Sequence, residues 1–324
     1  MWRLIFILFC FCLMAIQVHS QCNGLCDYFK IEPFQMEPCV DTRYVLKFKD
    51  EFNGKHINKD VWMLIPWKQG SSINGSEKQI NTLDPDNLEV SNGTLKISIQ
   101  KGKKTRKQVD WEPKDKVMED SAMNLRVYEY SSSNIWTKQN DFGEGKYEIR
   151  FRMDAMDAMW PAFWLYSGDG PTAGGSKWNE FDIFEVFYKK NKWDFTTNVH
   201  YDYENDGSNK DNFCPSHEKR KDLDEWHTVT CYFTEQEILI YLDDELMERK
   251  LKYRTWTGRP VTCKYPKRKA RREMYGWPRE SGHMVLNMAL RNLHEGIPDG
   301  PDDFPCTFEV DYVKYWVLSD QQTK

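Results

Sequence analysis

The chain has 324 residues, a formal net charge of −5 and a charged fraction of 29%. Its hydrophobic content of 40% is enough for a packed core and excludes wholesale disorder. The weakly acidic balance supplies no basic face, so we expect no nucleic-acid partner. The unusual figure is 15% aromatic residues, with 13 Trp, 16 Tyr and 18 Phe, which is typical of β-strands and of flat apolar binding surfaces.

Residues 1–20 have the pattern of a secretory signal peptide. A basic residue, Arg3, precedes an apolar run over residues 4–16, and residues 18–20 resemble a cleavage site. The run is shorter than the ~20 apolar residues that a spanning helix needs, and no later segment of the sequence is comparably apolar. We therefore expect a secreted, extracellular protein, with the periplasm or the cell surface as alternatives, and no stable membrane insertion.

Two of the nine cysteines lie in this signal segment, which leaves seven. Export makes disulfide bonds feasible, and we expect them here. Because seven is odd, at least one cysteine stays free or pairs outside the chain. The seven are Cys22, Cys26, Cys39, Cys214, Cys231, Cys263 and Cys306.

Short alternating runs separated by turns predict an all-β chain. In residues 145–153, apolar Tyr147, Ile149, Phe151 and Met153 alternate with charged residues. Residues 87–99 predict a hairpin around the turn Asn92-Gly93. Further predicted strands span residues 227–233, 237–242, 246–250, 284–290 and 307–318.

These features predict an antiparallel β-sandwich or barrel. No long segment has a helical apolar period, and there is no internal repeat. No Pro/Gly/Ser linker divides the chain, so we expect one domain over residues 39–320, preceded by a lead-in over residues 21–38. Residues 101–120 and 264–272 are rich in charge and are predicted as surface loops.

Residues 178–187 carry three acidic side chains on one predicted strand. Alternation places Glu180 and Asp182 on the same face as Trp178. It would bury Glu185, and an unpaired buried carboxylate is costly. A one-residue bulge near Ile183-Phe184 would return Glu185 to the face of the other two acids, and bulges are common beside active sites.

Three carboxylates on one face repel each other, which raises the pKa of at least one of them. One ionised and one protonated carboxyl group are what a two-carboxylate glycosidase uses, with the pair ~5–5.5 Å apart in retaining enzymes. The alternatives are a solvated acidic strand and a calcium site. A Ser-His-Asp hydrolase is disfavoured because no Gly-x-Ser-x-Gly motif occurs.

Aromatic residues surround this strand in the sequence. Trp160 and Trp164 lie upstream in Trp-Pro-Ala-Phe-Trp, and His200 lies downstream. Aromatic faces stack on sugar rings and His200 can donate to a sugar hydroxyl, so Trp160, Trp164, Trp178 and His200 are candidate substrate-binding residues. Asn74 is a further candidate. Core packing is the alternative for each tryptophan.

The acidic motif resembles the bulged Glu-x-Asp-x-x-Glu motif of glycoside hydrolase family 16, the laminarinase, lichenase and agarase group. Residues 50–54, 87–99, 142–148, 160–164, 286–289 and 310–314 resemble further landmarks of that family in the same order. The resemblance implies a concanavalin-like β-jelly-roll sandwich with a concave substrate cleft. It also implies retaining hydrolysis, with Glu180 as nucleophile, Glu185 as acid/base and Asp182 as helper.

The resemblance further implies a structural calcium ion held by Glu51 and Asp311, and no cofactor for catalysis. The expected protein is a monomeric endo-β-glycan hydrolase, with a polysaccharide such as β-1,3-glucan as substrate. A galactan is the alternative substrate, because residues 132–134 and 157–159 depart from the laminarinase pattern and residues 264–272 are basic. A transglycosylase and a non-catalytic glycan-recognition protein on the same fold also stay open as hypotheses.

Overall fold

The computed structural model of this chain describes residues 43–64, 77–107, 118–120, 125–168, 178–203, 210–211, 216–220, 222–254, 272–273, 276–291, 297 and 303–319. Within these ranges the protein is built from β-strands and contains no α-helix. No described helix is therefore available to cross a membrane. The all-β fold class predicted from the sequence is confirmed.

The strands are β1 (Tyr44–Asp50), β2 (Trp62–Leu64), β3 (Gln79–Asn81), β4 (Leu88–Ser91), β5 (Thr94–Lys107), β6 (Met118–Asp120), β7 (Leu125–Ser132), β8 (Asn134–Thr137), β9 (Gly145–Met153), β10 (Met159–Tyr166), β11 (Trp178–Lys189), β12 (Lys192–Asp202), β13 (Lys210–Asp211), β14 (Ser216–Arg220), β15 (His227–Phe233), β16 (Glu237–Leu242), β17 (Glu245–Leu251), β18 (Tyr253–Arg254), β19 (Arg272–Glu273), β20 (His283–Leu290) and β21 (Cys306–Leu318).

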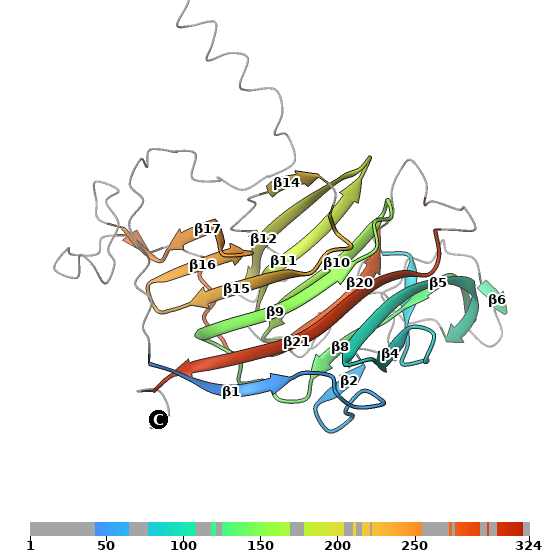
Figure 1. The fold of residues 1–324 in the computed structure, drawn as a ribbon, viewed down its shortest axis with the longest axis horizontal. Coiled ribbons are helices and arrows are strands. Elements are labelled where there is room, and N and C mark those ends of the chain that lie inside the picture. Colours follow the sequence, from blue (N-terminus) through green and yellow to red (C-terminus); the bar gives the residue numbers. More distant parts are fainter. Residues whose placement is uncertain are drawn as a thin grey trace, which may run out of the picture.

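Two large sheets form the two layers of a sandwich (Figure 1). The outer sheet has the order β17-β16-β15-β9-β21-β5-β7-β3, with β1, β4 and β6 paired at its sides. The second sheet has the order β13-β12-β11-β10-β20-β8-β2, with β14 beside β12. It contains the acidic strand β11 and is called the cleft sheet, because the resemblance implies a substrate cleft at that strand. Neighbours are antiparallel except for β3 and β7, and β18 and β19 form a separate ribbon.

Alternating burial explains why these segments are strands. Along β9 every second residue is buried, including Tyr147, Ile149 and Phe151, which matches the predicted inward positions. β4 and β5 form the predicted hairpin, and both turn residues, Asn92 and Gly93, have positive φ angles of 55° and 75°. Two consecutive positive φ angles define the turn that matches the twist of a two-stranded ribbon.

One of the predicted loops begins as a strand. β5 continues to Lys107, and its residues 104–107 pair with residues 125–128 of β7. The prediction of a loop from residue 101 was wrong over this part because ladder hydrogen bonds come from the backbone and do not require apolar side chains. The second predicted loop, residues 264–272, lies outside the described residues except for Arg272 in β19.

Aromatic side chains join the two sheets in the core. Phe151 of the outer sheet stacks on Phe184 of the cleft sheet with ring centroids 4.8 Å apart, and Phe181 contacts Phe233 at 5.6 Å. All four side chains are buried. Contacts of this geometry stabilise the fold by about 0.5–1.5 kcal/mol beyond the area they bury, so much of the aromatic excess belongs to the core.

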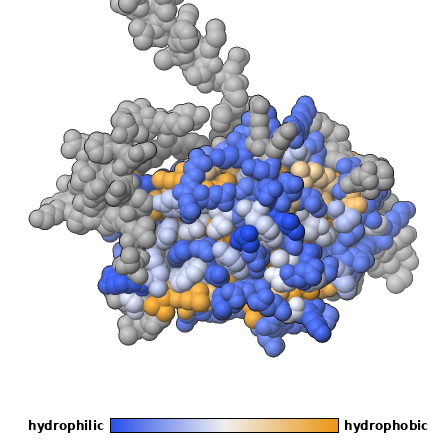
Figure 2. Space-filling view, in the orientation of Figure 1, coloured by the Kyte–Doolittle hydropathy of each residue, from blue (hydrophilic) through white to orange (hydrophobic). Residues whose placement is uncertain are grey.

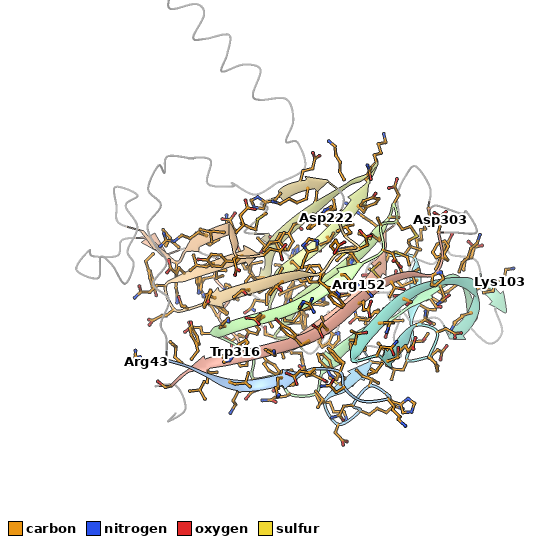
Figure 3. The ribbon with its side chains drawn as sticks, in the orientation of Figure 1. Arg43, Lys103, Arg152, Asp222, Asp303 and Trp316 are labelled. Carbon is orange, nitrogen blue, oxygen red and sulfur yellow. The ribbon has the colours of Figure 1, made fainter. Side chains whose placement is uncertain are left out.

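The outward face of the outer sheet is mainly hydrophilic, with small hydrophobic areas (Figure 2). Charged and aromatic side chains of β9 and β21 cover it, among them Arg152 and Trp316 (Figure 3). Arg152 Nε donates to Glu309 at 2.7 Å, and Lys146 Nζ lies 4.4 Å from the ring centroid of Trp316. This face therefore presents paired charges to solvent.

Two cysteines fall within the described part of the chain. Cys231 and Cys306 are both buried as free thiols, and burial raises the pKa of each thiol. The expected disulfide bonds do not involve these two residues. The other five mature cysteines, the signal segment and the lead-in over residues 21–38 lie outside the described residues, so the predictions for them stay predictions.

The Gly282→Ala substitution tests the close approach of two chain segments beside the cleft sheet. A Cβ atom at Gly282 would lie 2.0 Å from the carbonyl oxygen of Tyr166 and 2.7 Å from the amide nitrogen of Ser167. Backbone atoms cannot move aside cheaply, so we expect a loss of roughly 1–3 kcal/mol in the free energy of unfolding. Thermal unfolding measures it.

The matched control is Gly54→Ala, where the added Cβ would lie 3.2 Å from a backbone oxygen of His56 in an exposed loop. We expect a much smaller change in Tm for this variant. An equal Tm for the two variants would show that the packing around Gly282 does not limit stability.

Candidate active site

A β-bulge interrupts β11 between the acidic residues. Asp182 is opposite Asn198 on β12, whereas Glu185 is opposite Thr196, so three residue steps on β11 match two on β12. The register with β10 shifts at the same place. Ile183 and Phe184 are both fully buried, which confirms the bulge predicted from the sequence.

Phe184 has a defined place in the core that holds this bulge. Besides the stacked ring of Phe151, its ring lies 5.7 Å from Phe195, 6.3 Å from Phe163 and 6.3 Å from Phe308, measured between centroids. Removing a ring from such a cluster costs about 3–5 kcal/mol. The aromatic core therefore fixes the orientation of the residue that follows, Glu185.

The bulge also disturbs the hydrogen-bond ladder, and a side chain compensates for it. The hydroxyl of Thr197, which is buried, donates to the backbone carbonyl of Asp182 at 2.7 Å. A buried carbonyl without a partner would cost about 1–3 kcal/mol. Thr197 is thus part of the support for the bulged strand.

Glu180, Asp182 and Glu185 lie together on the open face of the cleft sheet. Glu185 Oε1 accepts a hydrogen bond of 2.8 Å from the indole Nε1 of Trp160. His200 Nε2 lies 3.4 Å from Asp182 Oδ2 and 3.9 Å from Glu180 Oε1. Asp182 is only 3% exposed and lies between the other two acids along the strand.

Crowding and burial perturb both glutamates. The pKa of Glu180 is raised to about 8, first by burial and then by the charge of Asp182, while His200 opposes the rise. The pKa of Glu185 is raised to about 8 for the same two reasons, and His200, the Trp160 hydrogen bond and Arg291 oppose it. The protons therefore leave this coupled group in separate steps, so near neutral pH the site retains a proton.

His200 is held by the neighbouring residue on its own strand face. Asn198 Oδ1 accepts from the backbone amide of Val199 at 2.8 Å, so its amide nitrogen, Nδ2, faces His200 Nε2 at 3.1 Å. In that arrangement Nε2 is the acceptor, which corresponds to a neutral imidazole protonated on Nδ1. Protonation of Nε2 would instead pair the ring with the carboxylate of Asp182.

The three predicted tryptophans take different positions. Trp160 is partly exposed beside Glu185, and its ring centroid lies 5.4 Å from that of Phe187. Trp178 is partly exposed and stacks on Tyr166 at 5.8 Å. Trp164 is only 6% exposed and donates its indole N–H to Asn287 at 2.7 Å. Sugar contact therefore stays a prediction for all three, with Trp164 offering the least surface.

The structure adds residues to the cleft floor that the sequence reasoning missed. Trp136 packs against Trp164 and Tyr166 with centroid distances of 5.7 and 5.4 Å, and its indole N–H donates to Asn134 at 2.8 Å. Asn134 and Asn287 face each other across β8 and β20. The signal in the sequence was a single amide in each of two largely apolar strands. Asn74 lies outside the described residues.

Glu51 and Asp311, the expected calcium ligands, are paired with basic side chains. Glu51 lies 3.2 Å from Lys49 Nζ and 3.8 Å from Lys314 Nζ, and Asp311 accepts from Arg150. Calcium prefers several converging oxygen ligands without competing cations. As they lie, these residues do not fit a calcium site, and calcium stays a prediction from the resemblance.

Residues 103–288, more than half of the chain, match the family described as glycosyl hydrolases family 16. The chain belongs to this family, and the resemblance inferred from its motifs is confirmed.

Particular relatives are distant. The chain is 23% identical to glucan endo-1,3-beta-glucosidase A1 of Niallia circulans over 278 aligned residues. The aligned region covers 84% of this chain and 37% of that protein. The chain thus spans little more than a third of that relative.

Solved structures share the fold. LamA of Z. galactanivorans, in complex with laminaritriose and laminaritetraose, has a TM-score of 0.58 at 22% identity and covers 84% of this chain and 98% of its own. An endo-acting O-glycanase of the human gut microbiota, described in the context of mucin breakdown, has a TM-score of 0.62 at 21% identity. The match covers 87% of this chain and 94% of the glycanase chain.

The Glu185→Gln substitution should stabilise the folded protein, and more so as pH rises. The raised folded-state pKa means that the unfolded chain loses its proton above about pH 4.5 while the folded chain keeps it, so the original residue lowers stability progressively between pH 4.5 and 8. Glutamine avoids this loss. We expect a gain in Tm of roughly 2–6 °C at pH 7.5 and almost none at pH 4.5.

The same substitution at Glu89, which is exposed on β4 of the outer sheet, is the control. Thermal unfolding of both variants is compared at several pH values. A gain for Glu185→Gln that does not depend on pH would contradict the explanation by a raised pKa.

Proposed function

We propose that this protein is a secreted endo-β-glycan hydrolase that cleaves its polysaccharide with retention of configuration, and that β-1,3-glucan is its first candidate substrate. The observation that carries the proposal is the bulge in β11, which brings Glu185 to the same open face as Glu180 and Asp182. A purely structural acidic strand would not need this device.

The chemistry follows from the two glutamates. Glu180, ionised, attacks the anomeric carbon while Glu185, protonated, gives its proton to the departing glycosidic oxygen. The sugar is then bonded to Glu180 as an ester. Glu185, now ionised, removes a proton from water, whose oxygen attacks the same carbon and releases Glu180.

The surroundings of the two glutamates suit these roles. The raised pKa values support a site that retains a proton at neutral pH, and the first step requires one on Glu185. His200 lies 3.9 Å from Glu180 and lowers the pKa of that glutamate, so it favours the ionised form that attacks. Trp160 holds Glu185 through a hydrogen bond that the protonated and ionised forms can both accept.

The substrate is proposed from the cleft and the relatives together. The relative from Niallia circulans is named as an endo-1,3-beta-glucosidase, and the LamA structure holds laminari-oligosaccharides. The partly exposed Trp160 and Trp178 offer the aromatic faces on which sugar rings stack. A galactan stays the alternative, and the glycanase neighbour adds mucin glycans to the polymers worth testing.

The Glu180→Gln substitution should abolish turnover because an amide cannot form the ester intermediate. We expect kcat to fall by at least about 10³-fold, in line with the loss of a catalytic nucleophile. The measurement is the release of reducing ends from laminarin, lichenan, agarose, porphyran, carrageenan and mucin, with Glu89→Gln as the matched control.

The release of reducing ends from these polymers distinguishes the candidate functions. Full activity of the Glu180→Gln variant would remove Glu180 as the nucleophile. Binding to a polymer by the unaltered protein without release of ends from any of them would favour the glycan-recognition protein. Products longer than the starting chains would identify a transglycosylase.

The Glu185→Ala substitution tests the other role. We expect a large loss of activity that azide partly restores on an activated aryl glycoside, because azide can attack the glycosyl-enzyme without a general base. The product should be a glycosyl azide with retained anomeric configuration, as read by NMR. A product of inverted configuration would show that azide attacks the glycoside directly in the place of Glu185, and would overturn the assignment of Glu185 as acid/base.

A further inference from the structure

We propose that the end of the cleft next to Glu185 holds a second subsite, built around Arg291 and Lys190, that binds an anionic substituent on the glycan chain. This inference rests on the proposed function, because it names a property of the polymer in the same cleft. The ligand is a sulfate ester or a carboxylate carried by the sugar chain.

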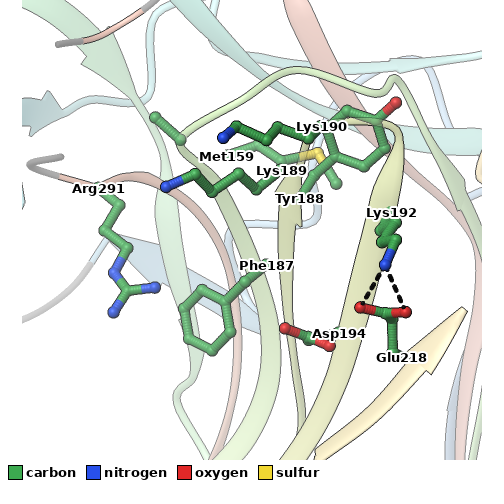
Figure 4. Close-up of a pocket in the computed structure, with 10 residues that line it drawn as sticks. Met159, Phe187, Tyr188, Lys189, Lys190, Lys192, Asp194, Glu218 and Arg291 are labelled. Atoms are coloured by element: carbon green, nitrogen blue, oxygen red, sulfur yellow. Dashed lines mark hydrogen bonds and ion pairs between the residues drawn. The ribbon is translucent and has the colours of Figure 1, made fainter. Parts of the chain in front are cut away.

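A pocket of about 330 Å³ lies at this place (Figure 4). Four basic side chains line it, and only two acidic ones do. The basic residues are Lys189, Lys190, Lys192 and Arg291, and the acidic residues are Asp194 and Glu218. In a chain of net charge −5 this excess of positive charge is local, and it lines a concave part of the surface on which Lys189, Lys190 and Arg291 are exposed.

One ion pair accounts for part of this charge. Lys192 Nζ lies 2.9 Å from Glu218 Oε1 and 3.1 Å from its Oε2, so these two residues neutralise each other. Lys189 and Lys190 extend across the pocket in the direction of Arg291 (Figure 4). The proposal therefore depends on Arg291 and Lys190, with Lys189 contributing to the field.

The pocket is continuous with the catalytic face through a row of aromatic contacts. Phe187 is two residues beyond Glu185 on β11, so both side chains are on the same face of the sheet. The ring of Phe187 packs on Trp160, whose indole N–H holds Glu185. The guanidinium of Arg291 lies 4.6 Å from the centroid of the Phe187 ring.

Arg291 is well placed for an anion beside a sugar ring. It follows β20 two residues after Ala289, which is opposite Trp160, so it lies on the cleft face. A guanidinium stacked on an aromatic ring keeps its N–H groups free in its own plane, where they match the oxygens of a sulfate or carboxylate. Arg291 also lowers the pKa of Glu185, which places its charge within electrostatic reach of the reacting bond.

The hairpin turn presents Lys190 at the rim of the pocket. Lys190 and Asn191 have positive φ angles of 52° and 63°, which define a tight two-residue turn between β11 and β12. The backbone amide of Lys190 donates to Asp157 Oδ1 at 3.1 Å. The turn is thus anchored, and the ammonium group is carried on a fixed backbone.

The test measures binding by a protein that cannot turn over. The Glu180→Gln variant is titrated with laminarin, sulfated laminarin and laminarin oxidised to carboxylates at C6, and with porphyran and its desulfated form, by affinity electrophoresis. We expect at least one charged polymer to bind roughly tenfold more tightly than its uncharged counterpart, in a salt-dependent manner. Comparison of the two charged laminarins distinguishes sulfate from carboxylate.

Substitutions assign this preference to the pocket. Arg291→Gln and Lys190→Gln, each added to the inactive variant, should remove most of the preference. Lys47→Gln on β1 of the outer sheet is exposed, removes the same charge away from the cleft, and should leave the preference unchanged. Thermal unfolding checks that each protein is folded, and Lys190→Gln decides the result if Arg291→Gln is unstable.

Two results would overturn the subsite. One is equal affinity for the charged and uncharged polymers. The other is a preference for the charged polymer that survives both Arg291→Gln and Lys190→Gln, or that Lys47→Gln reduces as much as these two substitutions do. Failure of the proposed function is a separate result, because it is the lack of released ends from every polymer by the unaltered protein, and the binding comparison does not depend on it.

Discussion

The packing of Phe184 in the core is the interaction on which the rest of the site depends. Its ring contacts four other phenylalanines contributed by both sheets. Burying Phe184 beside Ile183 breaks the alternation of β11 by one residue, and this turns Glu185 outward. The hydrophobic effect, which has no direction of its own, thereby sets the position of a polar group on the opposite face of the sheet.

The same face concentrates charges that oppose folding. Two glutamates keep raised pKa values because burial and Asp182 disfavour their ionised forms. His200, Trp160 and Arg291 offset part of this cost, each from a different strand or strand end. The packed core of the sandwich lies behind this site, and a division between a stabilising interior and a destabilising active-site surface is common in enzymes.

Much of this could be predicted from the sequence. Period-two alternation located β9 and β15, a short apolar run located β16, and the conflict between alternation and a buried Glu185 predicted the bulge. The extension of β5 to Lys107 was missed because backbone pairing leaves no mark on side-chain composition. Pairings between distant strands, such as the one that brings Asn134 opposite Asn287, were also beyond prediction, since register depends on the whole sheet.

The hydrogen bond between Trp160 and Glu185 has a spectroscopic consequence. The indole N–H points at Glu185, the group whose protonation changes during the proposed reaction. Indole emission depends on the polarity and charge next to the ring, so the fluorescence of this tryptophan reports on the charge of Glu185. Because the chain has 13 tryptophans, this contribution is read as the difference in emission between the unaltered protein and a Trp160→Phe variant.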